Sequence, residues 1–187
     1  MPRIYGERII LREYKEEDLP HIQAWVNNPD ITDMLSNIFM FPHTKNKTEK
    51  FLNSMLESET IEAYGFVIAH KDTEKYIGQI DLVRIDWKNR KALMGIIVGS
   101  PQNHNQGYGT EAINLLLTYG FDRLGLNKIE LEVRDYNKRA IRCYEKCGFK
   151  TEGILKEDFY IQGKFTDTIR MAILKKEWEK IRCDNKA

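Results

Sequence analysis

Two glycines, Gly107 and Gly109, lie in the loop NHNQGYGT, between the apolar segment GIIVG and the helix-forming segment EAINLLL. Because glycine has no Cβ, successive backbone N–H groups of such a loop can converge on one point. The first turn of the following helix adds unpaired N–H groups and the positive end of the helix dipole. This combination predicts a site for a pyrophosphate, although a glycine-rich turn without a ligand has the same pattern.

The residues around the two glycines exclude two other phosphate-binding motifs. A P-loop ends in Gly-Lys-Ser/Thr, whereas here Gly109 is followed by Thr110 and Glu111. A dinucleotide-binding fingerprint requires a third glycine three residues on, where this chain has Ala112. The predicted anion site therefore belongs to neither class.

Hydrophobic periodicity predicts the elements that must position this loop. We expect a strand at 7–14, helices at 16–28 and 45–57, an irregular apolar segment at 31–43, an antiparallel meander of strands at 63–70, 75–85 and 91–99, a helix from the glycine loop to Gly125, a strand at 128–134, a helix between Asn137 and Gly148, and strands at 151–161 and 165–174. This order predicts a mixed α/β fold in a single domain spanning residues 1–187.

Composition is that of a globular protein, with 42% hydrophobic and 30% charged residues. The formal net charge of +1 provides no global field toward nucleic acid or a membrane surface. The sequence contains no apolar run long enough to span a bilayer, and its N-terminus lacks the apolar stretch of a signal peptide. We therefore expect a cytoplasmic protein. Three cysteines, an odd number, favour free thiols over a disulfide framework or a metal site.

The loop is similar to the signature of the GNAT superfamily of N-acetyltransferases, Gln/Arg-x-x-Gly-x-Gly/Ala, with His104 in the place of Gln or Arg. The segment DYNKRAIRCYEKCGF is similar to the asparagine-to-tyrosine helix of that family, and IILREYKEEDL and GKFTDTIRMAILKKEW extend the resemblance over essentially the whole chain. The resemblance implies a GNAT-like fold, with a mixed, mostly antiparallel sheet flanked by helices. It also implies acetyl-CoA as cosubstrate, no metal, and a homodimer.

The resemblance assigns residues to CoA. The loop residues that it implies for the pyrophosphate are His104, Gln106, Gly107, Tyr108, Gly109 and Thr110. It implies that a strand containing Ile96, Ile97 and Val98 splays at a bulge and pairs its backbone with the pantetheine arm, with N–H groups near Ile97 facing the oxyanion. It further implies that Asn137 caps its helix and bonds the pantetheine, and that Arg139 and Arg142 reach the CoA phosphates. An ordinary core strand and solvated arginines are the alternatives.

Tyr144 is the catalytic acid that the resemblance implies, because the tyrosine of the family's helix protonates the departing thiolate. A phenol with a pKa of about 10 can supply a proton to a thiolate whose conjugate acid has a pKa near 8.5. The alternative is a half-buried tyrosine with a packing role.

The general base is not predicted by the resemblance. Many relatives carry Glu at the second position of an Ala-Glu-x-Gly run, and this chain has Leu93 there. Asp81, Asp86, His104 and a water relay are candidates for the base. Without a dedicated base, an acceptor with a low pKa, such as a peptide N-terminus, is easier to deprotonate than a polyamine.

The expected activity is transfer of acetyl from acetyl-CoA to a primary amine, of a peptide N-terminus or of a small molecule, by direct attack on the thioester. Two branches of the superfamily look nearest, one acting on N-termini of ribosomal proteins and the other on spermidine and spermine. The polyamine reaction, and a CoA-binding sensor without turnover, remain open alternatives. We expect neither nucleic acid nor a membrane as a partner.

Overall fold

The computed structural model describes residues 3–57 and 64–184. The strands are β1 (Ile4–Tyr5), β2 (Ile9–Arg12), β3 (Tyr64–His70), β4 (Tyr76–Asp86), β5 (Lys91–Val98), β6 (Lys128–Arg134), β7 (Lys150–Ile161) and β8 (Lys164–Leu174). The α-helices are α1 (Leu19–Trp25), α2 (Pro29–Thr32), α3 (Lys45–Leu56), α4 (Tyr108–Thr118), α5 (Lys138–Lys146) and α6 (Lys175–Asp184). Short 3₁₀ turns lie at Glu16–Asp18, Asn37–Phe39 and Pro101–Asn103, and a π-helical turn at Tyr119–Arg123 extends α4.

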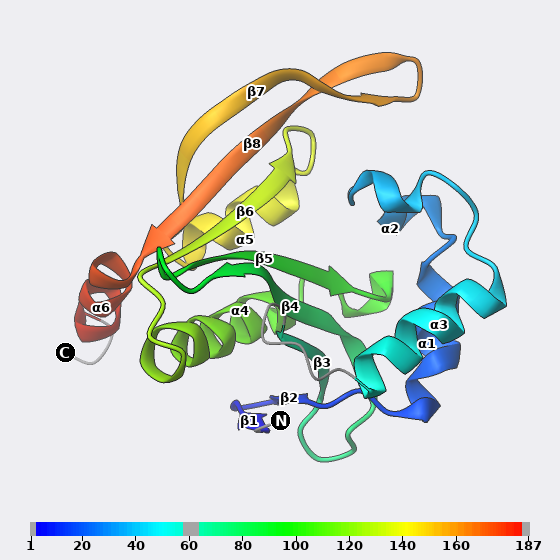
Figure 1. The fold of residues 1–187 in the computed structure, drawn as a ribbon, viewed down its shortest axis with the longest axis horizontal. Coiled ribbons are helices and arrows are strands. Elements are labelled where there is room, and N and C mark those ends of the chain that lie inside the picture. The colour runs from blue at the N-terminus through cyan, green and yellow to red at the C-terminus, as the bar shows by residue number, and fades with distance from the viewer. Residues whose placement is uncertain (1–2, 58–63, 185–187) are drawn as a thin grey trace.

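The strands form one mixed sheet with the order β1-β2-β3-β4-β5-β6-β8-β7 (Figure 1). Strands β3, β4 and β5 make the predicted antiparallel meander. The pair β5–β6 is parallel, and every other pair is antiparallel. The predicted mixed, mostly antiparallel sheet is therefore confirmed.

Alternation along the strands sends side chains to two cores, one on each face of the sheet. In β2, Ile9 and Leu11 join the core that α4 covers, whereas Ile10 joins the core beneath α1 and α3. The first core also receives Tyr144 from α5 and Trp178 from α6. Helices α1 to α3 thus cover one face, and α4, α5 and α6 pack on the other (Figure 1).

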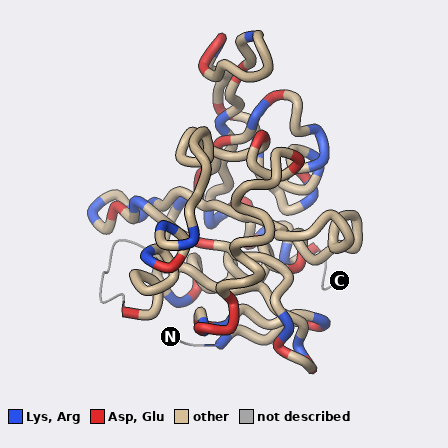
Figure 2. Tube along the Cα trace, turned by 90° about the vertical axis from the view of Figure 1, so that its right-hand side faces the viewer, with Lys and Arg blue, Asp and Glu red and all other residues tan. Residues whose placement is uncertain are grey.

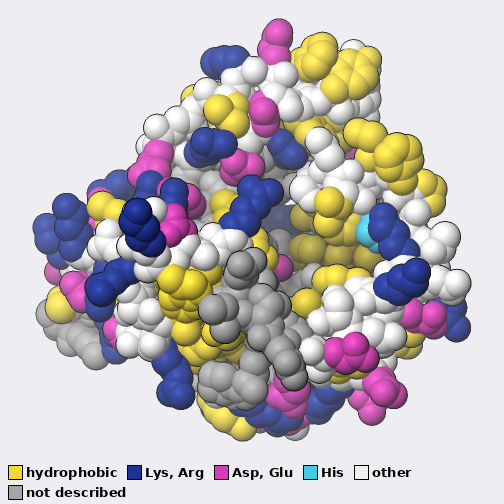
Figure 3. All heavy atoms as spheres, in the orientation of Figure 1, with side chains coloured by type: hydrophobic (Ala, Val, Ile, Leu, Met, Phe, Trp, Pro, Cys, Tyr) yellow, Lys and Arg dark blue, Asp and Glu magenta, His cyan; other side chains and the backbone are white. Residues whose placement is uncertain are grey.

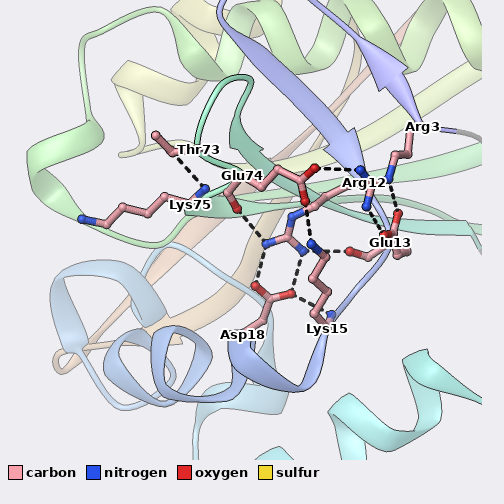
Figure 4. Close-up of polar contacts among 8 residues, drawn as sticks. All are labelled: Arg3, Arg12, Glu13, Lys15, Asp18, Thr73, Glu74 and Lys75. Carbon is pink, nitrogen blue, oxygen red and sulfur yellow. Dashed lines mark hydrogen bonds and ion pairs between the residues drawn. The ribbon is translucent and has the colours of Figure 1, made fainter.

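A buried ion pair joins β2 to the start of α1 (Figure 4). The guanidinium of Arg12 donates to both carboxylate oxygens of Asp18 at 2.8 Å, and each side chain is only 3% exposed. Asp18 also accepts the backbone N–H of Lys15 at 2.9 Å, and Arg12 donates to the carbonyl of Glu74 at 3.1 Å. The pair therefore fixes the angle at which the chain leaves the sheet for α1.

The β7–β8 hairpin reaches over the sheet toward α2 at the top of Figure 1. Tyr136 follows β6, and its hydroxyl donates to the backbone carbonyl of Asp33 at 2.5 Å. Gln162, in the hairpin turn, donates to the carboxylate of Asp33 at 3.0 Å. Arg134 lies 3.8 Å from the ring centroid of Phe159. These contacts hold the segment after α2 against the far end of the sheet.

Charged residues of both signs are interspersed along the chain trace (Figure 2). Several pair between strands, as Arg170 of β8 does with Glu132 of the neighbouring β6 at 3.1 Å, and Lys128 of β6 with Glu152 of β7 at 2.7 Å. Exposed pairs of this kind contribute at most about 1 kcal/mol each. None of the helices in the described ranges combines the length and the apolar composition that a membrane-spanning helix requires.

Two features differ from the sequence-based expectation. The chain does not end on a strand, because α6 follows β8 and packs Trp178 against Phe121, with ring centroids 5.3 Å apart. The segment 31–43, expected to be irregular, contains the end of the short helix α2 and a 3₁₀ turn at Asn37–Phe39. In both cases tertiary packing stabilises an element whose local pattern is weak.

Candidate active site

A cavity of about 1200 Å³ lies between the sheet, α1 to α3 on one side and the starts of α4 and α5 on the other. Figure 3 shows the molecule hollowed at this place, with hydrophobic side chains inside and Lys, Arg and His side chains at the margin. Of the residues predicted to bind CoA or to act as the acid, all except Gln106 line the cavity: Ile96, Ile97, Val98, His104, Gly107, Tyr108, Gly109, Thr110, Asn137, Arg139, Arg142 and Tyr144.

The cavity opens where two neighbouring strands separate. Strands β5 and β6 pair only from Lys91 to Leu93 on β5, opposite residues 128–130 of β6. From Met94 onward β5 continues beside β4 while β6 turns away, as Figure 1 shows. The edge of β5 from 94 to 98 therefore faces the cavity instead of a neighbouring strand, which leaves backbone groups for an extended ligand.

The glycine loop lies at one end of this opening. Gly107 has φ of +83°, a left-handed conformation that glycine adopts without strain, and it immediately precedes α4. A Cβ built at Gly109 would lie 3.7 Å from the sulfur of Cys143, an ordinary contact, so the glycine leaves a small space open at the helix start. The first-turn N–H groups of α4 have no intrahelical acceptor and suit an anion.

His104 links the end of β5 to α5. Its Nε2 lies 3.3 Å from the carbonyl of Val98, and its Nδ1 lies 2.5 Å from a guanidinium nitrogen of Arg139. The arginine donates, so Nδ1 is the acceptor and Nε2 carries the proton. Burial, with the neighbouring Arg139 as a smaller cause, lowers the pKa of His104, so the ring is neutral at pH 7. Both ring nitrogens are engaged within the protein.

Gln106 is the predicted residue that turns away. Its side chain donates to the carbonyl of Gln102 at 2.6 Å, and its own carbonyl accepts from Arg8 at 2.9 Å. Arg8 also pairs with Glu111 at 3.0 Å and lies 5.1 Å from the centroid of the Tyr108 ring. The sequence alone does not predict that Arg8 contacts the loop, because the two are about one hundred residues apart along the chain and no local pattern links them.

Tyr144 is held on α5 by a defined start and end of the helix. Asn137 caps the helix by accepting the N–H of Ala140 at 3.2 Å, and Gly148 ends it with φ of +92°. The Tyr144 side chain lines the cavity and exposes 9% of its surface. Burial raises the pKa of Tyr144 above its usual value, so the phenol keeps its proton at neutral pH.

Cys143, next to Tyr144, also lines the cavity. Its sulfur lies 3.3 Å from the hydroxyl of Thr110, which joins α5 to the first turn of α4. A hydrogen bond from Cys147 is the main cause that lowers the pKa of Cys143 below its usual value. The cysteines are free thiols, as expected, in the described part of the chain.

The two carboxylates that are candidates for the base differ in whether they line the cavity. Asp86 is the last residue of β4, where it accepts from the side chain and backbone of Asn89 at 2.6 and 2.9 Å, and it does not line the cavity. Asp81 does line the cavity, opposite Gly95 on β5. Burial raises the pKa of Asp81 to about 6, although a hydrogen bond from the backbone of Gly95 acts in the opposite direction. Leu93 lines the same cavity.

The half of the cavity under α1 to α3 is mainly apolar. Its lining includes Trp25, Val26, Ile31, Leu35, Phe39 and Phe51. Among the described residues of segment 22–51 that line it, Asp30 is the carboxylate, and Lys47 and His43 are basic or titratable. The sequence shows that segment 31–43 is apolar, but only the fold shows that this segment lines the cavity.

Comparison with known proteins places these features in one family. A family model described as an acetyltransferase (GNAT) domain matches residues 8–150. The spermidine N(1)-acetyltransferase of Escherichia coli K12 is 39% identical over 170 residues, covering 90% of this chain and 87% of that protein. The corresponding Vibrio cholerae protein is 32% identical over 174 residues, covering 92% and 96%. The crystal structure of the V. cholerae spermidine N-acetyltransferase in complex with CoA and spermine matches with a TM-score of 0.80 and 30% identity, over 92% of this chain and 98% of that one.

Proposed function

Because the chain belongs to the GNAT acetyltransferase family, we propose that it transfers acetyl from acetyl-CoA to the primary amine of a small molecule with an apolar body. The observation that carries the proposal is a single cavity with two unlike halves. One half combines the free edge of β5 with the glycine loop, and the other is an apolar space under α1 to α3. Acetyl transfer needs both, because the donor and the acceptor must meet at one carbonyl carbon.

The first half fits CoA. The loop from Gly107 to Thr110 and the start of α4 would hold the pyrophosphate, with Arg139 and Arg142 of α5 nearby. The edge of β5 at Ile96 to Val98 would pair with the amides of the pantetheine arm. When bound, acetyl-CoA supplies the thioester that is the acetyl donor.

Tyr144 would act as the acid. The thiol group leaves as a thiolate, and a phenol that stays protonated at neutral pH can donate to it. Burial raises the pKa of Tyr144 further above neutral pH, and Tyr144 lines the cavity in which the thioester would lie.

The second half favours an acceptor with apolar surface. Aromatic side chains of Trp25, Phe39 and Phe51 would pack against alkyl or aryl groups, which contribute about 0.8 kcal/mol per buried CH₂. A polyamine carries several positive charges, and recognition of each requires a carboxylate or an aromatic face. Asp30, Asp81 and Glu132 are the described carboxylates that line the cavity, and Glu132 is already paired with Arg170 at 3.1 Å.

Two other acceptors remain candidates on specific observations. Relatives at 32% and 39% identity are spermidine N(1)-acetyltransferases, which supports a polyamine. A putative ribosomal N-acetyltransferase of Bacillus subtilis, 32% identical over 54% of this chain, supports a protein N-terminus. The alternative of a CoA sensor without turnover is not favoured, because Tyr144 lines the cavity in a protonated state.

The test is release of CoA thiol with four acceptors: a phenylalkylamine, a linear alkylamine, spermidine and a short peptide with a free N-terminus. We expect kcat/KM for the phenylalkylamine to exceed that for spermidine by about tenfold or more, as about 1.4 kcal/mol of extra apolar burial provides. Phe39→Ala should reduce this preference and leave the KM for acetyl-CoA unchanged. If spermidine is the best acceptor, the apolar assignment is wrong and the polyamine reaction is correct.

The proposal also covers the extent of the domain, the location of the protein and its assembly. We propose that residues 1–187 act as one domain in the cytoplasm, as a homodimer. Support for assembly comes from the V. cholerae spermidine N-acetyltransferase, which has been described as a dodecamer and is 31% identical over 91% of this chain. The oligomeric state can be measured directly by sedimentation.

A further inference from the structure

We propose that Asp81 accepts the proton that the amine loses during acetyl transfer, in place of the carboxylate that Leu93 lacks. The inference rests on the proposed function, since it requires an amine acceptor in the cavity. It assigns the base to β4, although the sequence pattern of relatives points to β5.

Gly95 makes room for the Asp81 carboxylate. The two residues are directly opposite each other on β4 and β5. A Cβ built at Gly95 would lie only 2.6 Å from Oδ1 of Asp81, closer than real contacts allow. The carboxylate therefore lies over the glycine and accepts a hydrogen bond from its backbone N–H. This contact directs the carboxylate to the part of β5 where the strand leaves β6 and borders the cavity.

Asp81 and Leu93 serve the same region of the cavity. Leu93 pairs with Val83, two residues from Asp81 along β4, so Asp81 and Leu93 are diagonal neighbours on one face of the sheet. Diagonal neighbours across antiparallel strands are about 7–8 Å apart. Aspartate at position 81 and the longer glutamate at position 93 can therefore each bring a carboxylate to the same part of the cavity.

The surroundings of Asp81 suit a base that works near neutral pH. Burial raises its pKa to about 6, close to the operating pH of a general base. The titratable and charged groups that border it or line the cavity around it come from every neighbouring element: Tyr14 after β2, Asp30 in α2, His43 before α3, Lys47 in α3, Arg84 on β4, His104 and Tyr108 near the start of α4, Glu132 and Arg134 on β6, and Lys138, Arg139, Arg142, Cys143, Tyr144 and Lys146 on α5. The pKa of Asp81 is set mainly by burial and secondarily by the Gly95 hydrogen bond.

The proposed step balances in atoms and charge. The nitrogen lone pair attacks the thioester carbonyl carbon, and the nitrogen becomes acidic as the N–C bond forms. Its proton passes to the carboxylate of Asp81 as the C–S bond breaks, and the sulfur takes the proton of Tyr144. Tyr144 and Asp81 then return to their starting states by exchange with water, leaving an amide and a free thiol.

The deciding experiment compares the pH profile of kcat/KM for wild type, Asp81→Asn and Asp72→Asn with the best acceptor. Asp72 is an exposed carboxylate in the β3–β4 turn and serves as the control. For the wild type and the control, we expect kcat/KM to fall as the pH decreases through about 6. The pH of this limb should be the same for every acceptor. Asp81→Asn should lower kcat/KM by about 10²–10⁴-fold and remove that limb.

A double variant tests the position of the base itself. Adding Leu93→Glu to Asp81→Asn should recover at least about tenfold of the lost activity, because the carboxylate returns to the same region from β5. If wild type turns over an amine and Asp81→Asn does so equally well with the same limb, the inference is wrong and the proposed function stands. If wild type turns over none of the amines, the proposed function fails and the inference fails with it.

Stability provides a readout without turnover. The pKa of Asp81 is higher in the folded than in the unfolded chain, so its contribution to stability is present at low pH and is lost as pH rises through about 6. Asp81→Asn should therefore melt higher relative to wild type at pH 8 than at pH 4. An equal difference at the two pH values would contradict the buried, raised-pKa carboxylate on which the inference depends.

Discussion

At the scale of single residues, the position of Tyr144 depends on where its helix begins and ends. Asn137 and Gly148 set where α5 begins and ends, which turns Tyr144 into the cavity. Burial then disfavours the phenolate. A phenol is protonated at pH 7 with or without burial, so the fold's contribution is to place Tyr144 at the wall of the cavity.

Tyr144→Phe should leave the affinity for acetyl-CoA unchanged and lower kcat by about 10²–10⁴-fold, because only the donated proton is removed. Calorimetric titration gives the affinity, and steady-state thiol release gives kcat. Residual activity should rise with an acetyl thioester donor whose thiol has a lower pKa, since the departing thiolate then needs the acid less. Wild-type turnover in the Phe variant would mean that Tyr144 has a packing role.

His104 connects two elements of the cavity wall through both of its ring nitrogens. It accepts from Arg139 and lies within hydrogen-bonding distance of the Val98 carbonyl, so it connects the end of β5 to α5. A base must have a free lone pair facing its proton donor. The lone pair of His104 is directed at Arg139, and the residue is better described as part of the frame around the cavity.

At the scale of elements, the ion pair of Arg12 and Asp18 holds α1 in place as a wall of the cavity. Helix α1 brings Ile22, Trp25 and Val26 to the lining. Its first turn is anchored by Asp18, which is buried and accepts from both Arg12 and the backbone of Lys15. The geometry of the acceptor half therefore depends on a contact outside it.

Asp18→Ala should destabilise the protein by about 3–5 kcal/mol, because it leaves the buried guanidinium of Arg12 without its partner. Glu17→Ala, an exposed neighbour in the same turn, is the matched control and should change stability by less than about 0.5 kcal/mol. Urea unfolding measures both. In the surviving folded fraction, KM for the acceptor should rise more than KM for acetyl-CoA. A loss below about 1 kcal/mol would mean that Arg12 finds other acceptors.

At the scale of the whole molecule, one sheet carries both halves of the cavity. The chain crosses from the α1–α3 face to the α4–α5 face through shared strands, and the opening between β5 and β6 lies between the two. A ligand along β5 therefore contacts parts of both cores. Binding at this place should stabilise the entire fold, because unfolding of either half destroys the site.

CoA at a free concentration of one hundred times its Kd should raise the stability by about 2.7 kcal/mol, which corresponds to a melting temperature about 5–11 °C higher for a chain of this size. Gly109→Val should lose this shift while remaining folded, because a side chain there faces the open space at the start of α4. Gly153→Val is the matched control, since a Cβ at Gly153 meets nothing within 4 Å, and it should keep the shift. A full shift in folded Gly109→Val would contradict the assignment of the loop to the CoA phosphates.

The sequence by itself determined the features that depend on neighbours along the chain. The spacing of Gly107 and Gly109 before an apolar helix, the cap at Asn137, the stop at Gly148 and the alternation in β6 are local patterns, and the structure contains each of them. The family resemblance followed from the same local segments, and the family match confirms it. The helix α6 was not predicted, because its sequence KKEWEKIRCD is highly charged and only Trp178 is buried.

Only the tertiary structure decided which distant residues meet in the cavity. The carboxylate of Asp81 lies over Gly95 because the register of β4 on β5 sets them opposite each other, and a shift of one residue would turn Asp81 to the other face. Register, burial and the contact of His104 with Arg139 depend on how strands and helices pack, and they have no signature in a short segment. For the same reason the pKa of Asp81, which burial controls, could not be predicted before the fold was known.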